Sequence, residues 1–157
     1  MAADLQDMAA FAKWVENITG ELDLSPSAAF AVQLCLEELV ANVILHAVPL
    51  AARKLSVTIS FVPAGKNLRV TVEDDGAPFD PTAAAIPSAK PDLNTTGGRG
   101  LMLIRHFAQA LTYSRAGDRN RTMLDFTNDD YTSPAPDRPP NTPNAHVTTA
   151  TATTTQR

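Results

Sequence analysis

The stretch 35-CLEELVANVILH-46 sets a carboxylate, an amide and an imidazole four residues apart, at Glu38, Asn42 and His46. Side chains four residues apart lie on one side of an α-helix, so the three form a polar stripe along an otherwise apolar helix. Carboxylates and amides are rarely buried without partners, which makes such a stripe a candidate functional feature. An ordinary solvent-exposed helix face remains the alternative for Glu38 and Asn42 taken alone.

The residues before this stretch place it within a long helix. Ser25 is a good N-cap and Pro26 suits the first helical position, so we expect the helix to run from Pro26 to about His46. A helix over residues 4–19 precedes it, because apolar residues recur there at helical spacing, and we expect Gly20 to end that helix.

Alternation of polar and apolar residues predicts strands in the rest of the chain. The expected elements are a strand over 55–62, a turn at 65–67, a strand over 68–72, a helix over 101–110, and a hairpin of strands 111–115 and 122–126 around residues 117–120. This order predicts an α+β fold, a two-layer α/β sandwich with helices on one face of a mixed sheet.

Two further clusters follow the predicted strands. The first, 73-EDDGAPFD-80, carries Asp74, Gly76 and Phe79, where a glycine lets a ligand approach the backbone and a carboxylate accepts from an amine. A polar turn that only closes the strand explains the same residues. The second, 97-GGRGLMLI-104, leads glycines into a helix, whose free N–H groups and dipole favour a phosphate. It matches neither a Walker A motif nor a dinucleotide fingerprint.

Two segments have a biased composition. The loop over residues 80–97 is rich in Ala, Pro, Ser and Thr, and at about 18 residues it is longer than most loops of a compact domain, which indicates a function. Residues 127–157 contain many Thr and Pro residues and few large apolar side chains, so we expect a disordered tail. The sequence therefore predicts one folded domain over residues 1–126 and a tail over 127–157.

Charge and cysteine content narrow the class of protein. The chain has 13 Lys and Arg against 17 Asp and Glu, and a net charge of −4 does not suit the phosphate backbone of nucleic acid. Cys35 is the only cysteine, which excludes an internal disulfide and a multi-cysteine metal site. No apolar run suits a membrane span and no basic segment opens a secretory signal, so a soluble cytoplasmic protein is expected.

Taken in order, the three clusters resemble the nucleotide-binding boxes of the GHKL ATPase superfamily, the Bergerat fold. The boxes are a Glu-x-x-x-Asn helix, Asp-x-Gly-x-x-Phe after a strand, and Gly-x-Gly-Leu opening a helix. The stretches 38–47 and 98–104 are similar to the anti-sigma factor serine/threonine kinase branch, typified by RsbW and SpoIIAB. The resemblance covers about residues 5–126 and implies an ATP-binding kinase domain of the HATPase_c type.

The resemblance implies a role for each matching residue of the first two boxes. Asn42 would hold a Mg²⁺ ion that bridges the ATP phosphates. Glu38 would be the general base, which accepts the proton of an attacking serine hydroxyl or orients a water. Asp74 would accept a hydrogen bond from the adenine amino group, and Gly76 would keep the backbone clear beneath the base.

The third box and the last strand supply the remaining matches. Gly98, Gly100 and Leu101 would bind the phosphates, and Thr122 matches a threonine that lies near adenine in the family. The loop over residues 80–97 would be a lid that closes over the nucleotide.

The resemblance implies an ATP- and Mg-dependent serine/threonine protein kinase. It would phosphorylate a STAS-domain anti-sigma factor antagonist and sequester a sigma factor by partner switching, with a homodimer as the common state of the family. Neither nucleic acid nor a membrane is an expected partner. The alternatives are a non-catalytic nucleotide-dependent partner-binding module, a histidine kinase ATPase domain and a simple ATPase. The presence of both Glu38 and Asn42 favours the kinase over the non-catalytic module.

Overall fold

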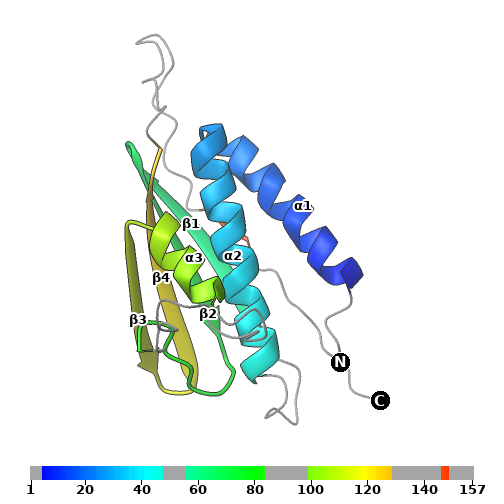
Figure 1. Cartoon of the computed structure of the whole chain (residues 1–157), viewed down its shortest axis with the longest axis vertical. Helices are drawn as coiled ribbons and strands as arrows, with labels where there is room; N and C mark the ends of the chain where they lie inside the picture. The colour runs from blue at the N-terminus through cyan, green and yellow to red at the C-terminus, as the bar shows by residue number, and fades with distance from the viewer. Residues whose placement is uncertain (1–4, 48–55, 84–98, 129–145, 149–157) are drawn as a thin grey trace.

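The computed structural model describes residues 5–47, 56–83, 99–128 and 146–148, which form two layers. Three helices cover one face of a five-stranded sheet (Figure 1). The elements in chain order are α1 (Leu5–Glu21), α2 (Pro26–Ala47), β1 (Val57–Ala64), β2 (Asn67–Asp74), α3 (Arg99–Phe107), β3 (Ala110–Ala116), β4 (Arg119–Thr127) and β5 (His146–Thr148). The predicted α+β sandwich with helices on one face is confirmed.

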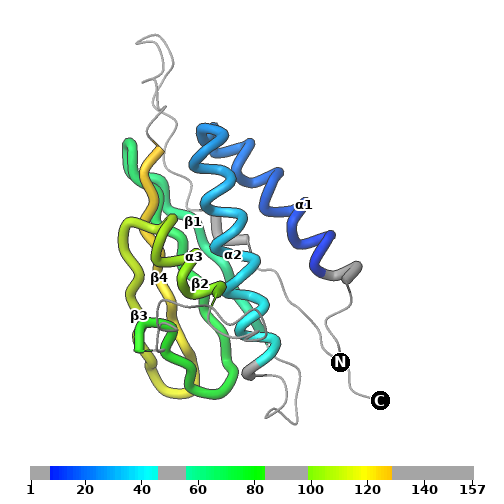
Figure 2. Tube along the Cα trace, viewed as in Figure 1, coloured from blue at the N-terminus to red at the C-terminus, as the bar shows by residue number. Residues whose placement is uncertain are grey.

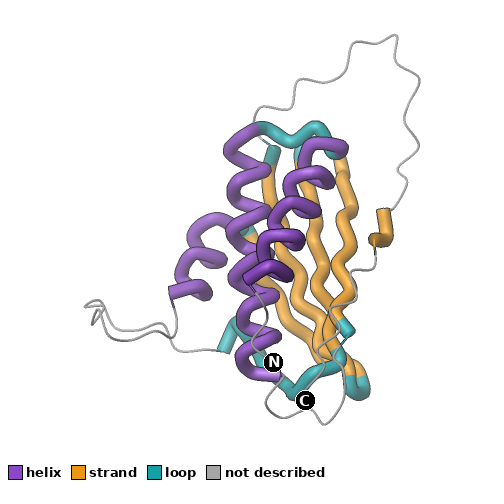
Figure 3. Tube along the Cα trace, turned by 90° about the vertical axis from the view of Figure 1, so that its right-hand side faces the viewer, coloured by secondary structure: helices purple, strands orange, loops and turns teal. Residues whose placement is uncertain are grey.

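All described strands pair antiparallel with their neighbours, in the order β3-β4-β2-β1-β5. The prediction of a mixed sheet is not met by the described strands. β2 and β3 run in the same direction, but β4 lies between them, so the described strands contain no parallel neighbours. Figure 3, turned by 90° from the first view, shows the helices and the strands as two separate layers.

The predicted helices and strands are present, with shifts at their ends. The helix predicted over 101–110 ends earlier, at the end of α3, because Gln109 already donates its N–H to the Asp125 carbonyl at the sheet (2.8 Å). The turn predicted at 117–120 is shorter, since Gly117 adopts a φ of 62° that suits a two-residue hairpin loop.

Helix α2 lies at the centre of the hydrophobic core, between α1 and α3 (Figure 2). Its residues Val32, Cys35 and Leu36 are fully buried, and they belong to one cluster with the fully buried Phe61 and Val70 of the sheet. By length and composition, α2 is also the one described helix that is long and apolar enough to cross a membrane. Its place in the core accounts for part of that composition, while Phe30 and Leu45 of the same helix are exposed.

Helix α1 ends in a Schellman motif. The N–H of Leu24 donates to the Thr19 carbonyl (3.2 Å), and the N–H of Asp23 donates to the Gly20 carbonyl (3.1 Å). Asp23 takes the left-handed conformation, with a φ of 53°, at the position where glycine is usual. Gly20 itself lies within the helix, so the prediction that it ends α1 is wrong.

Asn128 connects the loop between α1 and α2 to the sheet. Its side-chain oxygen accepts from the N–H of Ser25 (2.7 Å), and its side-chain nitrogen donates to the Asp23 carbonyl (3.3 Å). Its own N–H donates to the Lys66 carbonyl (2.7 Å). Ser25 in turn caps α2 as predicted, because its hydroxyl accepts from the N–H of Ala28 (3.2 Å). One asparagine therefore fixes the entry of the chain into α2.

The structure describes part of the segment that the sequence suggested to be a disordered tail. β4 includes Thr127, and Asn128 is only 4% exposed, so the folded part extends past residue 126. Residues 146–148 form β5, which pairs antiparallel with residues 59–61 of β1. The prediction of disorder remains untested for the rest of the tail, which lies outside the described residues.

We predict that Asn128→Ala destabilises the domain by about 2 kcal/mol, because the buried N–H of Ser25 loses its acceptor. Urea denaturation followed by circular dichroism measures the free energy of unfolding. The control is Asn67→Ala at an exposed position, which should change it by less than about 0.5 kcal/mol. Equal effects of the two substitutions would contradict the anchoring role of Asn128.

Candidate functional site

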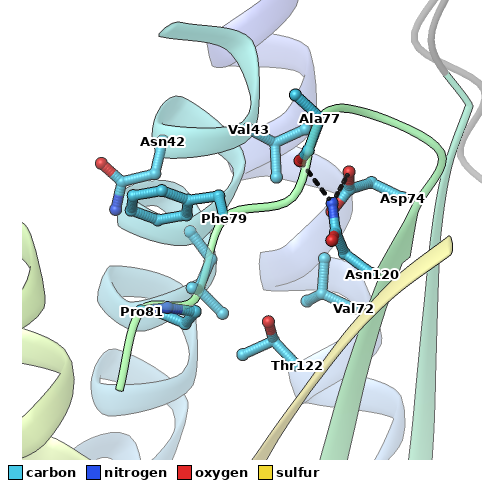
Figure 4. A pocket seen from close by; sticks show the side chains of 10 residues that line it. Asn42, Val43, Val72, Asp74, Ala77, Phe79, Pro81, Asn120 and Thr122 are labelled. Atoms are coloured by element: carbon cyan, nitrogen blue, oxygen red, sulfur yellow. Dashed lines mark hydrogen bonds between the residues drawn. The ribbon is translucent and has the colours of Figure 1, made fainter. Parts of the chain in front are cut away.

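A pocket opens between α2, the end of β2, the loop that follows it, and β4 (Figure 4). Most of its lining is apolar, with Asn42 at one end and Asp74 and Asn120 at the other. It therefore brings together three of the predicted site residues, Asn42, Asp74 and Thr122. The lining residues are Leu39, Asn42, Val43, Val72, Asp74, Ala77, Phe79, Pro81, Asn120 and Thr122.

Asp74 is buried at the end of β2 and is held by two donors on one oxygen. Its Oδ1 accepts from the N–H of Gly76 (2.9 Å) and from Nδ2 of Asn120 (2.8 Å). Within the described residues, Oδ2 accepts no hydrogen bond, so this oxygen remains available to a donor on a ligand. Gly76, predicted to clear space for a base, is buried and supplies its N–H to this arrangement.

Asn120 is a site residue that the sequence did not single out. The register of β2 and β4 places it directly opposite Asp74, and Thr122 directly opposite Val72. Asn120 and Thr122 are both buried, and both line the pocket. Alternation along β4 was the available signal, since a strand that turns Thr122 toward the helices turns Asn120 the same way.

Asn42 has a polar side chain that nothing in the described part of the chain engages. Its Nδ2 is buried without a hydrogen-bond partner among the described residues, beside the ring of Phe79 (Figure 4). Because no described neighbour forms a hydrogen bond with Nδ2, the amide can turn its oxygen toward a ligand. An amide oxygen is a suitable ligand for Mg²⁺, which usually takes few protein ligands and keeps several waters or phosphate oxygens. The described residues contain no cluster of three or more acidic, His or Cys side chains for a metal.

Glu38 lies one helical turn from Asn42 and contacts the start of α3 rather than lining the pocket. A Cβ added to Gly100 would collide with the Glu38 carboxylate. The first and third sequence clusters therefore meet at this point. The first turn of a helix carries free N–H groups and positive partial charge, so the carboxylate lies beside the expected phosphate site.

The remaining residues of the third cluster are placed only in part. Leu101 is 8% exposed and packs in the core, so only its backbone is available to a ligand. Gly98 lies outside the described residues. Arg105 of α3 donates from Nη2 to the carbonyls of Pro81 (3.3 Å) and Thr82 (2.8 Å), which joins α3 to the loop after β2. The predicted lid over 80–97 is described only as far as residue 83.

Cys35 lies one turn before Glu38 in α2 and is fully buried. Burial, with a smaller contribution from the charge of Glu38, raises the pKa of its thiol to about 12. A thiol that stays protonated at neutral pH is a poor nucleophile. Cys35 is therefore a core residue.

Comparisons with known proteins indicate the family of this chain. The family described as histidine kinase-like ATPase domain matches residues 1–127. The serine/threonine-protein kinase BtrW of Bordetella bronchiseptica is 30% identical over 113 residues, which cover 71% of this chain and 79% of that protein.

Two solved structures of the blue-light activated histidine kinase from Erythrobacter litoralis EL346 share the fold. Its histidine kinase domain gives a TM-score of 0.50 at 23% identity, over 79% of this chain and 60% of that one. The second structure gives a TM-score of 0.51 at 28% identity, over 68% of this chain. This chain spans only 32% of that second structure, so its length corresponds to a part of it.

We predict that Gly100→Ala gives less than the stabilisation usual for Gly→Ala in a helix, because its Cβ must displace the end of the Glu38 side chain. Urea denaturation measures the difference. The matched control is Gly20→Ala in α1, where a Cβ meets nothing within 4 Å and a gain of about 0.5–1 kcal/mol is expected. An equal gain at both glycines would contradict the close contact with Glu38.

Proposed function

We propose that this chain, which belongs to the histidine kinase-like ATPase domain family, is an ATP- and Mg-dependent serine/threonine protein kinase of the anti-sigma factor type. One observation carries the proposal: the pocket has a buried carboxylate at one end and Asn42 at the other, one helical turn from Glu38, whose carboxylate meets the start of α3. The similarity to a serine/threonine-protein kinase favours protein phosphorylation over the other reactions of this family.

The pocket offers a suitable environment for adenine. Its apolar side chains, among them Leu39, Val43 and Val72, can enclose the faces of a purine, and Oδ2 of Asp74 can accept from an exocyclic amine. The phosphates would extend toward the first turn of α3, whose N–H groups attract anions. Asn42 would hold a Mg²⁺ ion on the way, and that ion would neutralise charge on the phosphates.

Glu38 is the group we assign to proton transfer. In phosphoryl transfer to a protein, a serine hydroxyl attacks the γ-phosphorus, the bond to the leaving ADP oxygen breaks, and the hydroxyl proton must be accepted. The Glu38 carboxylate lies beside the helix start where the γ-phosphate is expected, which suits it to accept that proton. Positioning and charge neutralisation supply most of the remaining catalysis.

The protein substrate we propose is a serine of a STAS-domain anti-sigma factor antagonist. The proposal includes sequestration of a sigma factor when the antagonist is phosphorylated, a cytoplasmic location and a homodimer. Its support is the similarity of residues 38–47 and 98–104 to the anti-sigma factor kinase branch. A slow enzyme suits a stoichiometric switch, because the state of the partner rather than the turnover rate sets the output.

We predict that Glu38→Gln lowers the rate of phosphoryl transfer at least about 100-fold while ATP still binds, because the amide cannot accept the proton. The assay follows radiolabelled γ-phosphate from ATP to purified STAS-domain proteins of the same genome. Glu37→Gln is the matched control, since Glu37 accepts from Gln33 (3.0 Å) on another side of α2. Transfer by Glu38→Gln at the wild-type rate would contradict the proposal, and ATP binding without transfer by wild type would favour a non-catalytic partner-binding module.

For nucleotide binding, we predict that Asp74→Asn weakens ATP about 10-fold or more, because an amide cannot satisfy both Asn120 and the adenine amine as a carboxylate does. Asn42→Ala should remove most of the dependence of binding on Mg²⁺. Titration calorimetry with and without Mg²⁺ measures both effects. Loss of all ATP binding in Asn42→Ala when Mg²⁺ is absent would argue against a metal-ligand role for Asn42.

A further inference from the structure

Asn120 stands in the middle of a row of polar side chains that crosses three strands. In the register of the sheet it is opposite Asp74 of β2 and opposite Arg115 of β3. It is 2% exposed, and a buried amide is costly unless its hydrogen bonds are made. The proposed function assigns no role to it.

Every hydrogen-bonding site of the Asn120 side chain is used. Nδ2 donates to Oδ1 of Asp74 (2.8 Å) and to the Ala77 carbonyl (2.9 Å). Oδ1 accepts from the hydroxyl of Tyr113 (2.8 Å) and from Nη1 of Arg115 (2.6 Å). A flipped amide would place its oxygen against a carboxylate and a carbonyl, and its N–H groups against a guanidinium. Only one orientation is therefore compatible with these neighbours.

The Asn120 amide decides how the Asp74 carboxylate faces the pocket. With Gly76 and Asn120 both donating to Oδ1, that oxygen is occupied, and Oδ2 is the acceptor left for a ligand. Arg115 also donates to the Gly76 carbonyl (3.2 Å), so the same network holds the backbone that follows Asp74. The positive charge of Arg115 polarises the Asn120 amide and strengthens its donation to Asp74.

We propose that Asn120 is a positioning residue that makes this pocket selective for purines with an amino group at position 6. The inference rests on the proposed function, because it requires ATP to bind with its base beside Asp74. An oriented Oδ2 accepts from a 6-amino group, whereas a 6-carbonyl group would set two acceptors against each other. A site built to pair with an N–H rejects analogues that lack it, since its own polar group is then left unpaired.

The test compares two ligands on the full chain by titration calorimetry with Mg²⁺. The ligands are ATP and the 5′-triphosphate of purine riboside, which lacks the 6-amino group. We expect Asn120→Ala to weaken ATP about 10- to 100-fold. Binding of the purine riboside triphosphate should change by less than about 2-fold, because that ligand makes no hydrogen bond that depends on the orientation of Asp74.

Tyr113→Phe is the second variant, and it decides the matter if circular dichroism finds Asn120→Ala unfolded. It removes one of the two donors to Oδ1 of Asn120 and nothing else that the described residues use. We expect it to weaken ATP about 2- to 5-fold and to leave the purine riboside triphosphate unchanged.

The outcomes separate this inference from the proposed function. An equal loss for both ligands in Asn120→Ala, or no loss for either, would overturn the positioning role while the ATP site stands. Wild-type protein that binds both ligands equally well would also overturn the inference while the ATP site stands. Wild type that binds neither ligand would overturn the proposed function, and the inference with it.

Discussion

Helix α2 packs against α1, α3 and the sheet, and its residues Val32, Cys35 and Leu36 are fully buried. Rotation of α2 about its own axis would expose these three side chains. That constraint sets the direction of two polar side chains of the helix, Asn42 and Glu38. Asn42 faces the pocket, and Glu38 faces the start of α3. A helix of this composition has only a small polar part, and close packing of the remainder gives that part its direction.

The antiparallel register of β2 and β4 positions the site residues that come from the sheet. Asp74 ends β2, and β4 brings Asn120 and Thr122 alongside from a segment that is distant in sequence. The exposed face of the same strands carries the ion pairs Arg69–Asp125 and Arg121–Glu73, which alternate with the buried residues. A shift of one residue between β2 and β4 would exchange the two faces and remove the pocket.

Local signals in the sequence predicted most of the fold. The Ser25–Pro26 cap and the alternation in β1 and β2 depend on residues near one another in the chain, and the structure agrees with both. The three clusters are equally local, and the pocket brings Asn42 of the first together with Asp74 of the second. The sequence analysis missed residues whose roles depend on hydrogen-bond partners far away in the chain. Asn120 and Asn128 resemble ordinary loop asparagines until β4 is placed. The prediction that Gly20 ends α1 was wrong because the left-handed residue of the C-terminal cap is Asp23. The short polar side chain of Asp tolerates that conformation.

The place of β4 between β2 and β3 also determines how the chain assembles during its synthesis. A ribosome that has released residues 1–118 has released α2 and the first hairpin, but the edge of β2 that carries Asp74 has no partner strand. Asn128, the residue that anchors the entry to α2, follows later still. The nascent chain therefore holds an open strand edge from the completion of β2 until β4 emerges, the kind of edge that pairs with other chains unless it is shielded. Closure comes in one late step, when a single strand completes the sheet, the pocket and the anchor of α2 together.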